Sequence, residues 1–185
     1  MSTTEMRKER VIKRKSSTPE AEDLLEFFEK KKRRQEEEED QKRVPKREPG
    51  EEVLRAMEKL FGSEFTEPVW LGEKKLTKTD VHPHHQRFFF PQTMIEKLKP
   101  HLKAWEKGEI EPKDGAGIPV TIVDTLCGDW ELRLKRWASL QQFALLQGWK
   151  PLVKVNELKD EDRLGVWAYR HGPLHKLGFI LRRLH

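Results

Sequence analysis

Hydrophobic and polar residues alternate with a period of two in the second half of the chain. In WELRLKRW (130–137), Trp130, Leu132 and Leu134 fall on one face, with charged residues between them. This spacing predicts a half-buried β-strand. Similar short runs, separated by turn residues, occupy segments 74–81, 87–91, 117–124, 142–149, 163–170 and 176–183. We therefore expect a mainly β domain, built as an antiparallel barrel or sandwich.

Two other segments have helical spacing. In PGEEVLRAMEKLFGS (49–63), apolar residues recur every three or four positions, and Gly62 provides a stop signal. TMIEKLKPHLKAWEKGE (93–109) predicts a helix that is broken at Pro100. KPLVKVNELK (150–159) is expected to be a short connection between two strands.

Composition separates the two halves of the chain. Charged residues make up 37% and hydrophobic residues 35%, and all six tryptophans lie at or after Trp70. Only a segment rich in apolar side chains can offset the entropy of ordering the chain, so we expect the fold in the second half. The predicted organisation is a disordered or partly helical charged arm (1–49), a short helical lead-in (50–69) and a β domain (70–185).

The charge and cysteine content indicate where the protein works. The formal net charge of +5 and the sequence pI of about 9.2 favour polyanionic partners, although many basic domains bind none. The single cysteine, Cys127, rules out an internal disulfide framework and suits a reducing compartment. The sequence has no leader-like or membrane-spanning apolar stretch, so we expect a soluble, intracellular protein without membrane contact.

The strand at 130–137 carries the first candidate binding residues. Arg133 and Lys135 point away from the apolar face and lie about 6.5–7 Å apart, roughly one nucleotide step. Arg136 falls on the inward phase and Trp137 on the outward one, which suggests a bulge or a strand end near Lys135. A polar stretch follows at Ser139, Gln141 and Gln142. These side chains suit phosphate and base-edge contacts, but the alternative is a solvated outer face.

The order of several motifs resembles the plant B3 domain, in particular a divergent, plant-expanded branch. The motifs are LTKTDV (76–81), Arg87 before FFFP, WELRLKRW (130–137), LLQGWKPLVKVNELKDEDRLGVWAYR (145–170) and KLGFIL (176–181). The resemblance spans roughly residues 70 to 184. It implies a seven-stranded open β-barrel with short helices, a DNA-binding pseudobarrel whose two arms enter the major groove.

The resemblance also assigns residues to the two arms. The first arm corresponds to Thr77, Lys78 and Thr79 and the run to Arg87, which contains His84, His85 and Gln86; Lys75 is a further phosphate candidate. The second arm corresponds to Arg133, Lys135, Arg136, Trp137, Ser139, Gln141 and Gln142. One departure lies in the turn that matches the family's L-x-x-G-D pattern, where Glu161 replaces glycine.

These features predict sequence-specific binding of double-stranded DNA in the nucleus and a role in transcription regulation. The alternative is a divergent barrel that has lost specific DNA binding and serves as a protein-interaction module. RNA binding is disfavoured because no exposed aromatic pair suited to base stacking is evident.

Cofactor and catalytic chemistry are not expected. His82, His84 and His85 are close in sequence, but no second cluster of metal-ligating residues accompanies them, so we predict no metal site. The sequence contains no P-loop, no nucleophile–base order and no paired inward carboxylates, so we predict no enzyme activity and no cofactor.

The charged arm carries two candidate functions. Its basic clusters resemble a bipartite nuclear-import signal, with a solvated charge run as the alternative. The import candidates are Arg7, Lys8, Lys13, Arg14, Lys15, Lys30, Lys31, Lys32, Arg33 and Arg34. LLEFF (24–28), within residues 18–43, is a candidate docking turn for protein partners.

Overall fold

The computed structural model describes residue 31 and residues 47–85, 87–112, 115–137, 140 and 142–184. The predicted charged arm therefore lies almost entirely outside the described residues. The described elements are α2 (Glu51–Phe61), β1 (Val69–Lys75), α3 (Lys78–Val81), β2 (Arg87–Phe89), α4 (Gln92–Leu98), the 3-10 helix η1 (Lys99–His101), α5 (Ala104–Ile110), β3 (Ile118–Val123), β4 (Asp129–Trp137), β5 (Gln142–Leu146), α6 (Trp149–Val155), β6 (Arg163–His171) and β7 (Lys176–Leu184).

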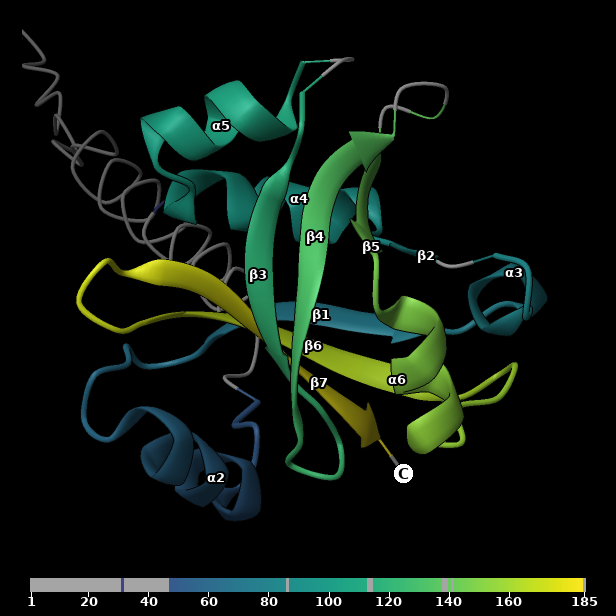
Figure 1. Ribbon diagram of the computed structural model, residues 1–185, viewed down its shortest axis with the longest axis horizontal. Helices are drawn as coiled ribbons and strands as arrows, with labels where there is room; N and C mark the ends of the chain where they lie inside the picture. The colour runs from purple at the N-terminus through teal and green to yellow at the C-terminus, as the bar shows by residue number, and fades with distance from the viewer. Residues whose placement is uncertain are drawn as a thin grey trace, which may run out of the picture. The chain divides into compact units, whose positions relative to one another are not determined.

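A single curled sheet forms the body of the described region (Figure 1). Its seven strands run in the order β1-β6-β7-β3-β4-β5-β2. Among the described strand pairs, only β3 with β7 is parallel. β1 and β2 lie at the two edges, so the barrel stays open between them. The predicted mainly β, seven-stranded open barrel with short helices is confirmed.

Strand β6 is buried on both faces, which explains its nearly continuous apolar sequence. Leu164, Val166 and Ala168 join the larger hydrophobic cluster inside the curled sheet. Trp167 and Tyr169 point the other way, into a second cluster. Two covered faces leave no polar positions between residues 164 and 169, so this strand reads as an apolar run rather than as an alternation.

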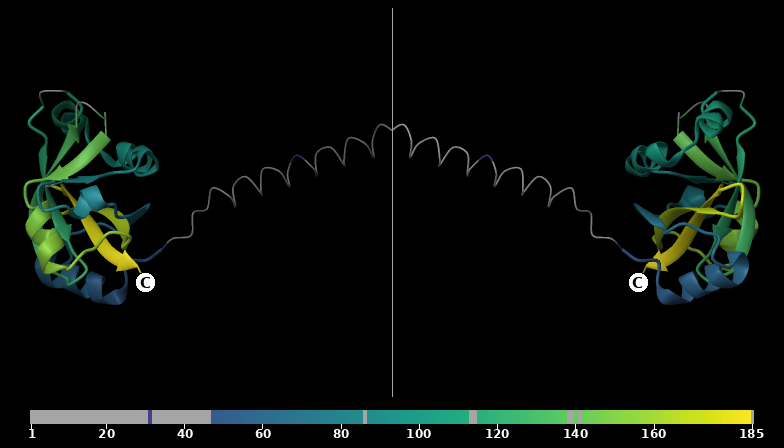
Figure 2. Two further views of the ribbon diagram at one scale, coloured as in Figure 1. Left: turned by 90° about the vertical axis from the view of Figure 1, so that its right-hand side faces the viewer. Right: turned by 90° about the vertical axis from the view of Figure 1, so that its left-hand side faces the viewer.

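Helix α2 covers the second cluster. Its residues Val53 and Met57 are fully buried against Trp167, Tyr169 and Ile180. The views in Figure 2 show α2, in dark blue, at the lower end of the domain and the teal helices of residues 92–110 toward the upper end. The predicted lead-in helix therefore contributes to the core of the β domain. None of the described helices is long and apolar enough to cross a membrane.

The predicted strand at 74–81 is wrong beyond its first two residues. β1 ends at Lys75, and Lys78–Val81 form the helical turn α3. The reason is local: the Thr77 backbone N–H and hydroxyl both donate to Asp80 Oδ2, at 2.9 and 2.7 Å. An Asp three residues after a Thr is a helix-start signal, and it overrides the strand preference of Thr and Val.

The predictions for 142–159 also need correction. β5 ends at Leu146, and Trp149 begins helix α6 where a strand end and a connection were expected. Gly148 turns the chain with a φ of +120°, a conformation that favours glycine. Pro151 is tolerated because it lies in the first turn of the helix. The expected break at Pro100 is confirmed, since η1 separates α4 from α5.

Strand β4 is continuous through the position where a bulge was considered. Its pairing with β5 runs without a register shift from Arg133↔Leu146 to Trp137↔Gln142. The bulge is therefore absent, and β4 ends at Trp137. The inward phase of Leu132 and Leu134 is confirmed by their burial.

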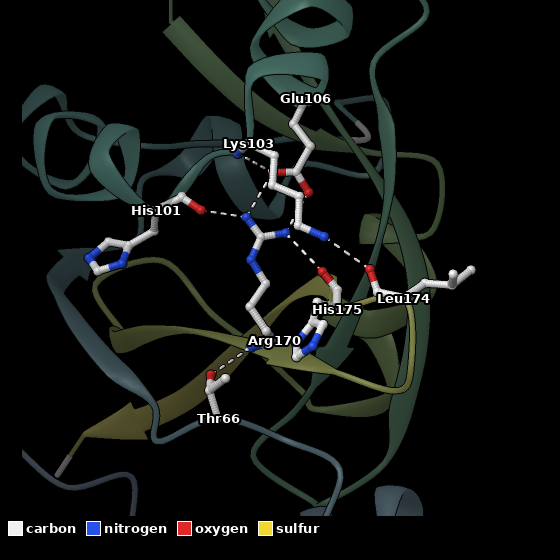
Figure 3. A network of polar contacts seen from close by, with 7 residues as sticks. All are labelled: Thr66, His101, Lys103, Glu106, Arg170, Leu174 and His175. Carbon is white, nitrogen blue, oxygen red and sulfur yellow. Dashed lines mark hydrogen bonds and ion pairs between the residues drawn. The ribbon is translucent and has the colours of Figure 1, made fainter.

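A buried ion pair fastens the end of β6. Arg170 donates to both carboxylate oxygens of Glu106, to His101 O and to His175 O, and its backbone N–H donates to Thr66 Oγ1 (Figure 3). Glu106 also accepts the Lys103 backbone N–H at 2.8 Å. We call this group the Arg170 clamp. It holds α5, the β6–β7 turn and the segment before β1 together.

Candidate nucleic-acid interface

The strand register brings residues of both predicted arms onto one face of the sheet. In β2, β5 and β4, Arg87 lies opposite Leu146, which lies opposite Arg133. Directly paired residues of antiparallel strands point to the same side. Two more rows extend this face, which we call the arm face; its residues are Arg87, Phe89, Arg133, Lys135, Trp137, Gln142, Ala144 and Leu146.

Side-chain contacts join the two arms across this face. The Arg87 guanidinium lies 4.5 Å from the centre of the Trp137 ring and 5.3 Å from that of Phe89. Phe89 and Trp137 themselves pack edge to face at 6.1 Å. A cation over an aromatic ring is held by the ring's negative face, so Trp137 orients Arg87. This assigns the half-buried Trp137 to the arm face.

The Arg133 side chain forms hydrogen bonds within its own domain. Its Nε donates to Gln147 Oε1 at 3.2 Å, and its Nη1 donates to Ala116 O and Gly117 O at 3.2 and 3.1 Å. These bonds fix the side chain beside the start of β3. A phosphate at this position would meet a guanidinium whose orientation is already set.

Lys135 and Arg136 lie on opposite sides of β4. Lys135 shares the arm face, whereas Arg136 lies opposite Phe143, a buried residue. Arg136 Nη1 donates to Glu111 O at 3.1 Å. Arg136 also lines a polar hollow together with Gln92, Ile95, Lys99, Glu111, Leu140, Gln142 and Phe143. Gln142 of the second arm lines the same hollow, so the structure places Arg136 near Gln142 but on the opposite side of β4 from Arg133, Lys135 and Trp137.

The first arm presents exposed polar side chains on α3. Lys78 and Thr79 are exposed, and Thr77 caps the turn. Lys75 forms an exposed ion pair with Glu161. Lys78 and Thr79 are therefore accessible to a large ligand.

The three loop histidines cluster before β2. The His82 ring centre lies 5.4 Å from that of His84 and 5.0 Å from that of His85. His82 and His84 are exposed and His85 is half-buried. Within the described ranges, no group of three or more His, Cys, Asp or Glu side chains could hold a metal ion.

Several predicted residues fall outside the described part of the chain. Gln86 of the first arm and Ser139 and Gln141 of the second belong to this group. So do Arg7, Lys8, Lys13, Arg14, Lys15, Lys30, Lys32, Arg33 and Arg34 of the import candidates. Lys31 is described, as an exposed helical residue.

The turn at 158–162 lies directly beside the first arm. The Glu161 backbone N–H donates to Leu76 O at 3.0 Å, and the Leu76 N–H donates to Asp162 O at 2.7 Å. Glu161 has a φ of +76°, in the left-handed region. The glycine expected from the L-x-x-G-D pattern has a physical reason here, and Glu161 occupies that conformation at a cost.

Sequence reasoning missed three residues of this region. Lys74 and Asp80 form a buried ion pair at 2.7 Å below α3, and Phe89 packs on Trp137. The Thr77-x-x-Asp80 spacing was the available signal for Asp80. Lys74 and Phe89 act through contacts between residues far apart in sequence, which one sequence does not reveal.

Comparisons with known proteins give consistent matches. A family model described as B3 domain-containing protein At2g31720-like matches residues 45–182. The B3 domain-containing protein At1g32030 of Arabidopsis thaliana is 31% identical over 145 residues, which cover 73% of this chain and 42% of that protein. The B3 domain-containing protein At1g05920, from the same plant, is 26% identical over 144 residues, covering 71% of this chain and 45% of that protein. The chain thus spans less than half the length of these curated relatives.

Solved structures also resemble the chain. The Arabidopsis FUS3-DNA complex matches with a TM-score of 0.43 and 22% sequence identity, covering 63% of this chain and 99% of that one.

Proposed function

Because the chain belongs to the B3 domain family, by its match over residues 45–182, we propose that it binds double-stranded DNA through the arm face and regulates transcription. The observation that carries this proposal is the contact between Arg87 and Trp137, which unites both arms in one cationic surface. The family match extends to residue 45 and thus includes α2, so we propose that the folded domain begins near residue 47.

The dimensions of the arm face support groove binding. Three neighbouring strands span about 10 Å from the first to the third, since adjacent strands lie about 4.8 Å apart. The major groove of B-DNA is about 12 Å wide and admits a two-stranded β-ribbon, so two of the three strands can enter it with their arm-face side chains. Arg87 and Arg133 lie in one row across the three strands, with Lys135 one step along β4.

The two kinds of DNA contact fall on different residues. We assign phosphate contacts to the exposed Lys78 and to the half-buried Lys135 and Arg133, because the positive charges of Lys and Arg attract any duplex. Base-edge contacts are assigned to Arg87, Gln142, His84 and His85, with Gln86, Ser139 and Gln141 as further candidates. Arg136 is left out of base readout because it faces away from the arm face.

A random-sequence DNA selection with the full chain tests this function. We expect an enriched duplex motif. The Arg87→Ala variant should bind this motif more weakly than the parent does, whereas the Lys176→Ala variant, which changes an exposed lysine of β7, should bind it equally well. Absence of binding to any duplex would contradict the proposal. The interaction-module function would then become the leading account.

We also propose that the protein acts in the nucleus and that its basic clusters at 7–15 and 30–34 direct import. The support is the pairing of two basic clusters with a B3 domain in one chain. Residues 1–46 fused to a bulky reporter should accumulate in nuclei, and neutralising both clusters should abolish the accumulation. Import that persists without the clusters would contradict this role.

A further inference from the structure

The open edge of the barrel is bridged by a lysine. β1 and β2 are the edge strands and are not neighbours in the sheet. The Lys74 ammonium, carried by β1, donates to the Phe89 backbone carbonyl of β2 at 2.7 Å. It also lies 4.5 Å from the centre of the Phe88 ring. Lys74 therefore connects the two edges at the place where no ladder of backbone hydrogen bonds does so in the described sheet.

The same ammonium holds the first arm through Asp80. Asp80 is 3% exposed, and its Oδ1 accepts a hydrogen bond from Lys74 at 2.7 Å. Its Oδ2 accepts the Thr77 backbone N–H and hydroxyl, and its backbone carbonyl accepts Trp149 Nε1 at 2.7 Å. Every polar group of Asp80 named here has a partner, so α3 has one defined position relative to β1 and α6.

Burial acts against the charge of Lys74. Loss of hydration lowers the pKa of Lys74 from its usual value, although the Asp80 carboxylate raises it. The charged form is thus less favoured in the folded protein than in a free lysine, in spite of its partner. A buried ion pair with this balance adds little to stability, and a fixed geometry is what it can provide.

We propose that the Lys74–Asp80 pair is a positioning device that fixes α3, which carries Lys78 and Thr79, relative to β2, which carries Arg87. This role rests on the proposed DNA-binding function. Groups that are ordered before binding do not lose that freedom on binding, so a fixed first arm binds DNA more tightly than a loose one. Lys74 and Asp80 act through the arm residues and make no contact with DNA themselves.

The test replaces the pair by neutral groups of similar shape. In the double variant Lys74→Met/Asp80→Asn, the amide oxygen of the introduced asparagine still caps the Thr77 N–H, and the introduced methionine keeps an apolar stem over Phe88. The control is Arg170→Met/Glu106→Gln, which neutralises the other buried pair. Two quantities are measured on the full chain: affinity for duplex DNA and hydrogen exchange of the amides in residues 77–90.

We expect the Lys74 double variant to lose about tenfold in DNA affinity, as when one or two side chains must be ordered during binding. Exchange in residues 77–90 should rise while exchange in β6 and β7 stays unchanged. The control should lower the unfolding midpoint but leave both affinity and exchange in residues 77–90 unchanged.

The possible results distinguish failure of the proposed DNA binding from failure of the proposed positioning role. If the parent protein binds no duplex DNA, the proposed function fails, and the exchange data still decide whether the pair positions the first arm. Unchanged exchange in residues 77–90 would overturn the positioning role. Should the double variant not fold, Lys74→Gln alone is measured, because it leaves no buried unpaired cation and Asp80 keeps its two hydrogen bonds from Thr77; the same changes are expected at smaller size. Global unfolding of both variants would show the pair to be structural and would also overturn the proposal.

Discussion

The two buried ion pairs among the described residues differ in what burial does to their charges. In the Arg170 clamp, burial raises the pKa of Glu106, but the Arg170 and Lys103 hydrogen bonds and charges outweigh burial and lower it. In the arm pair, burial lowers the pKa of Lys74 more than Asp80 raises it. Compared with the free side chains, the clamp therefore favours the charged carboxylate of Glu106, whereas the arm pair weakens the preference of Lys74 for its charged form.

The difference follows from the hydrogen bonds available at each place. Arg170 presents a planar fork that reaches both oxygens of Glu106 and two backbone carbonyls (Figure 3). A bidentate Arg–carboxylate pair is among the stronger polar contacts in proteins. Lys74 has one carboxylate oxygen and one carbonyl as partners. We infer that the clamp contributes stability, whereas the arm pair has the positioning role proposed above.

The largest expected effect lies at the second hydrophobic cluster, which stabilises the fold far from the arms. A fragment of residues 47–184 and the full chain should both unfold cooperatively in urea. A fragment of residues 65–184 should lose cooperative unfolding and bind the dye ANS, because it exposes Trp167, Tyr169 and Ile180. Burying one large side chain such as Met57 contributes about 2–5 kcal/mol, and the deletion removes several. Equal stability of the two fragments would show that α2 is dispensable.

Neutralising Glu106 should produce the next largest effect. Glu106→Gln leaves Arg170 without its charged partner, and breaking a buried pair costs about 3–5 kcal/mol. The penalty should depend on pH. Because the pKa of Glu106 is lowered on folding, its stabilisation is fully present above the ordinary value of 4.5 and is lost as the pH falls through the folded pKa.

Urea unfolding of the parent and of Glu106→Gln between pH 7 and pH 3 measures this dependence. The stability difference should shrink as the pH falls. If the stability difference stays constant with pH, the charge of the Glu106 carboxylate does not stabilise the clamp. The proposed difference between the two ion pairs would then be wrong.

A smaller effect is expected at the turn beside the first arm. Glu161→Gly should stabilise the domain by about 1 kcal/mol, because glycine adopts the left-handed conformation without the Cβ clash. Glu161→Ala is the matched control, since it removes the exposed pair with Lys75 but keeps the strain. Thermal unfolding compares the two. If Glu161→Gly has the same unfolding temperature as Glu161→Ala, the left-handed conformation at this position does not destabilise the domain.

The sequence predicted much of the sheet because period-two alternation is a local signal. β3, β4, β6 and β7 lie where it places them. Helices α3 and α6 were not predicted, and the reasons are again local. In and beside α3, Thr77, Thr79 and Val81 favour strands, and in α6 Val153 and Val155 do so. In both cases a start signal, the Asp80 cap or Gly148, overrides the propensity of the residues that follow.

The candidate site was less predictable because its defining contacts are not local. Arg87 and Trp137 lie 50 positions apart, and only the order of β4, β5 and β2 brings them together. The outward phase of Arg133 and Lys135 was readable, but the bonds from Arg133 to Ala116 O and Gly117 O were not. Alternation along a strand predicts on which side of the sheet a side chain lies, but it does not predict which residues that side chain contacts.

The central claim is that both arms bind DNA as one cationic face, and the salt dependence of binding tests it most directly. Affinity for a random duplex and for the selected site is measured at several salt concentrations for the parent, Arg87→Ala, Lys135→Ala and the control Lys176→Ala. In Lys135→Ala, the slope of log affinity against log salt should become shallower by about 0.9 for each phosphate contact that is lost. Replacement of any other arm residue that binds a phosphate should have the same effect. The control should keep the parent slope, and Arg87→Ala should lose affinity on the selected site. If both arm variants bind as the parent does, with its slope, the arm face is not the DNA-binding surface.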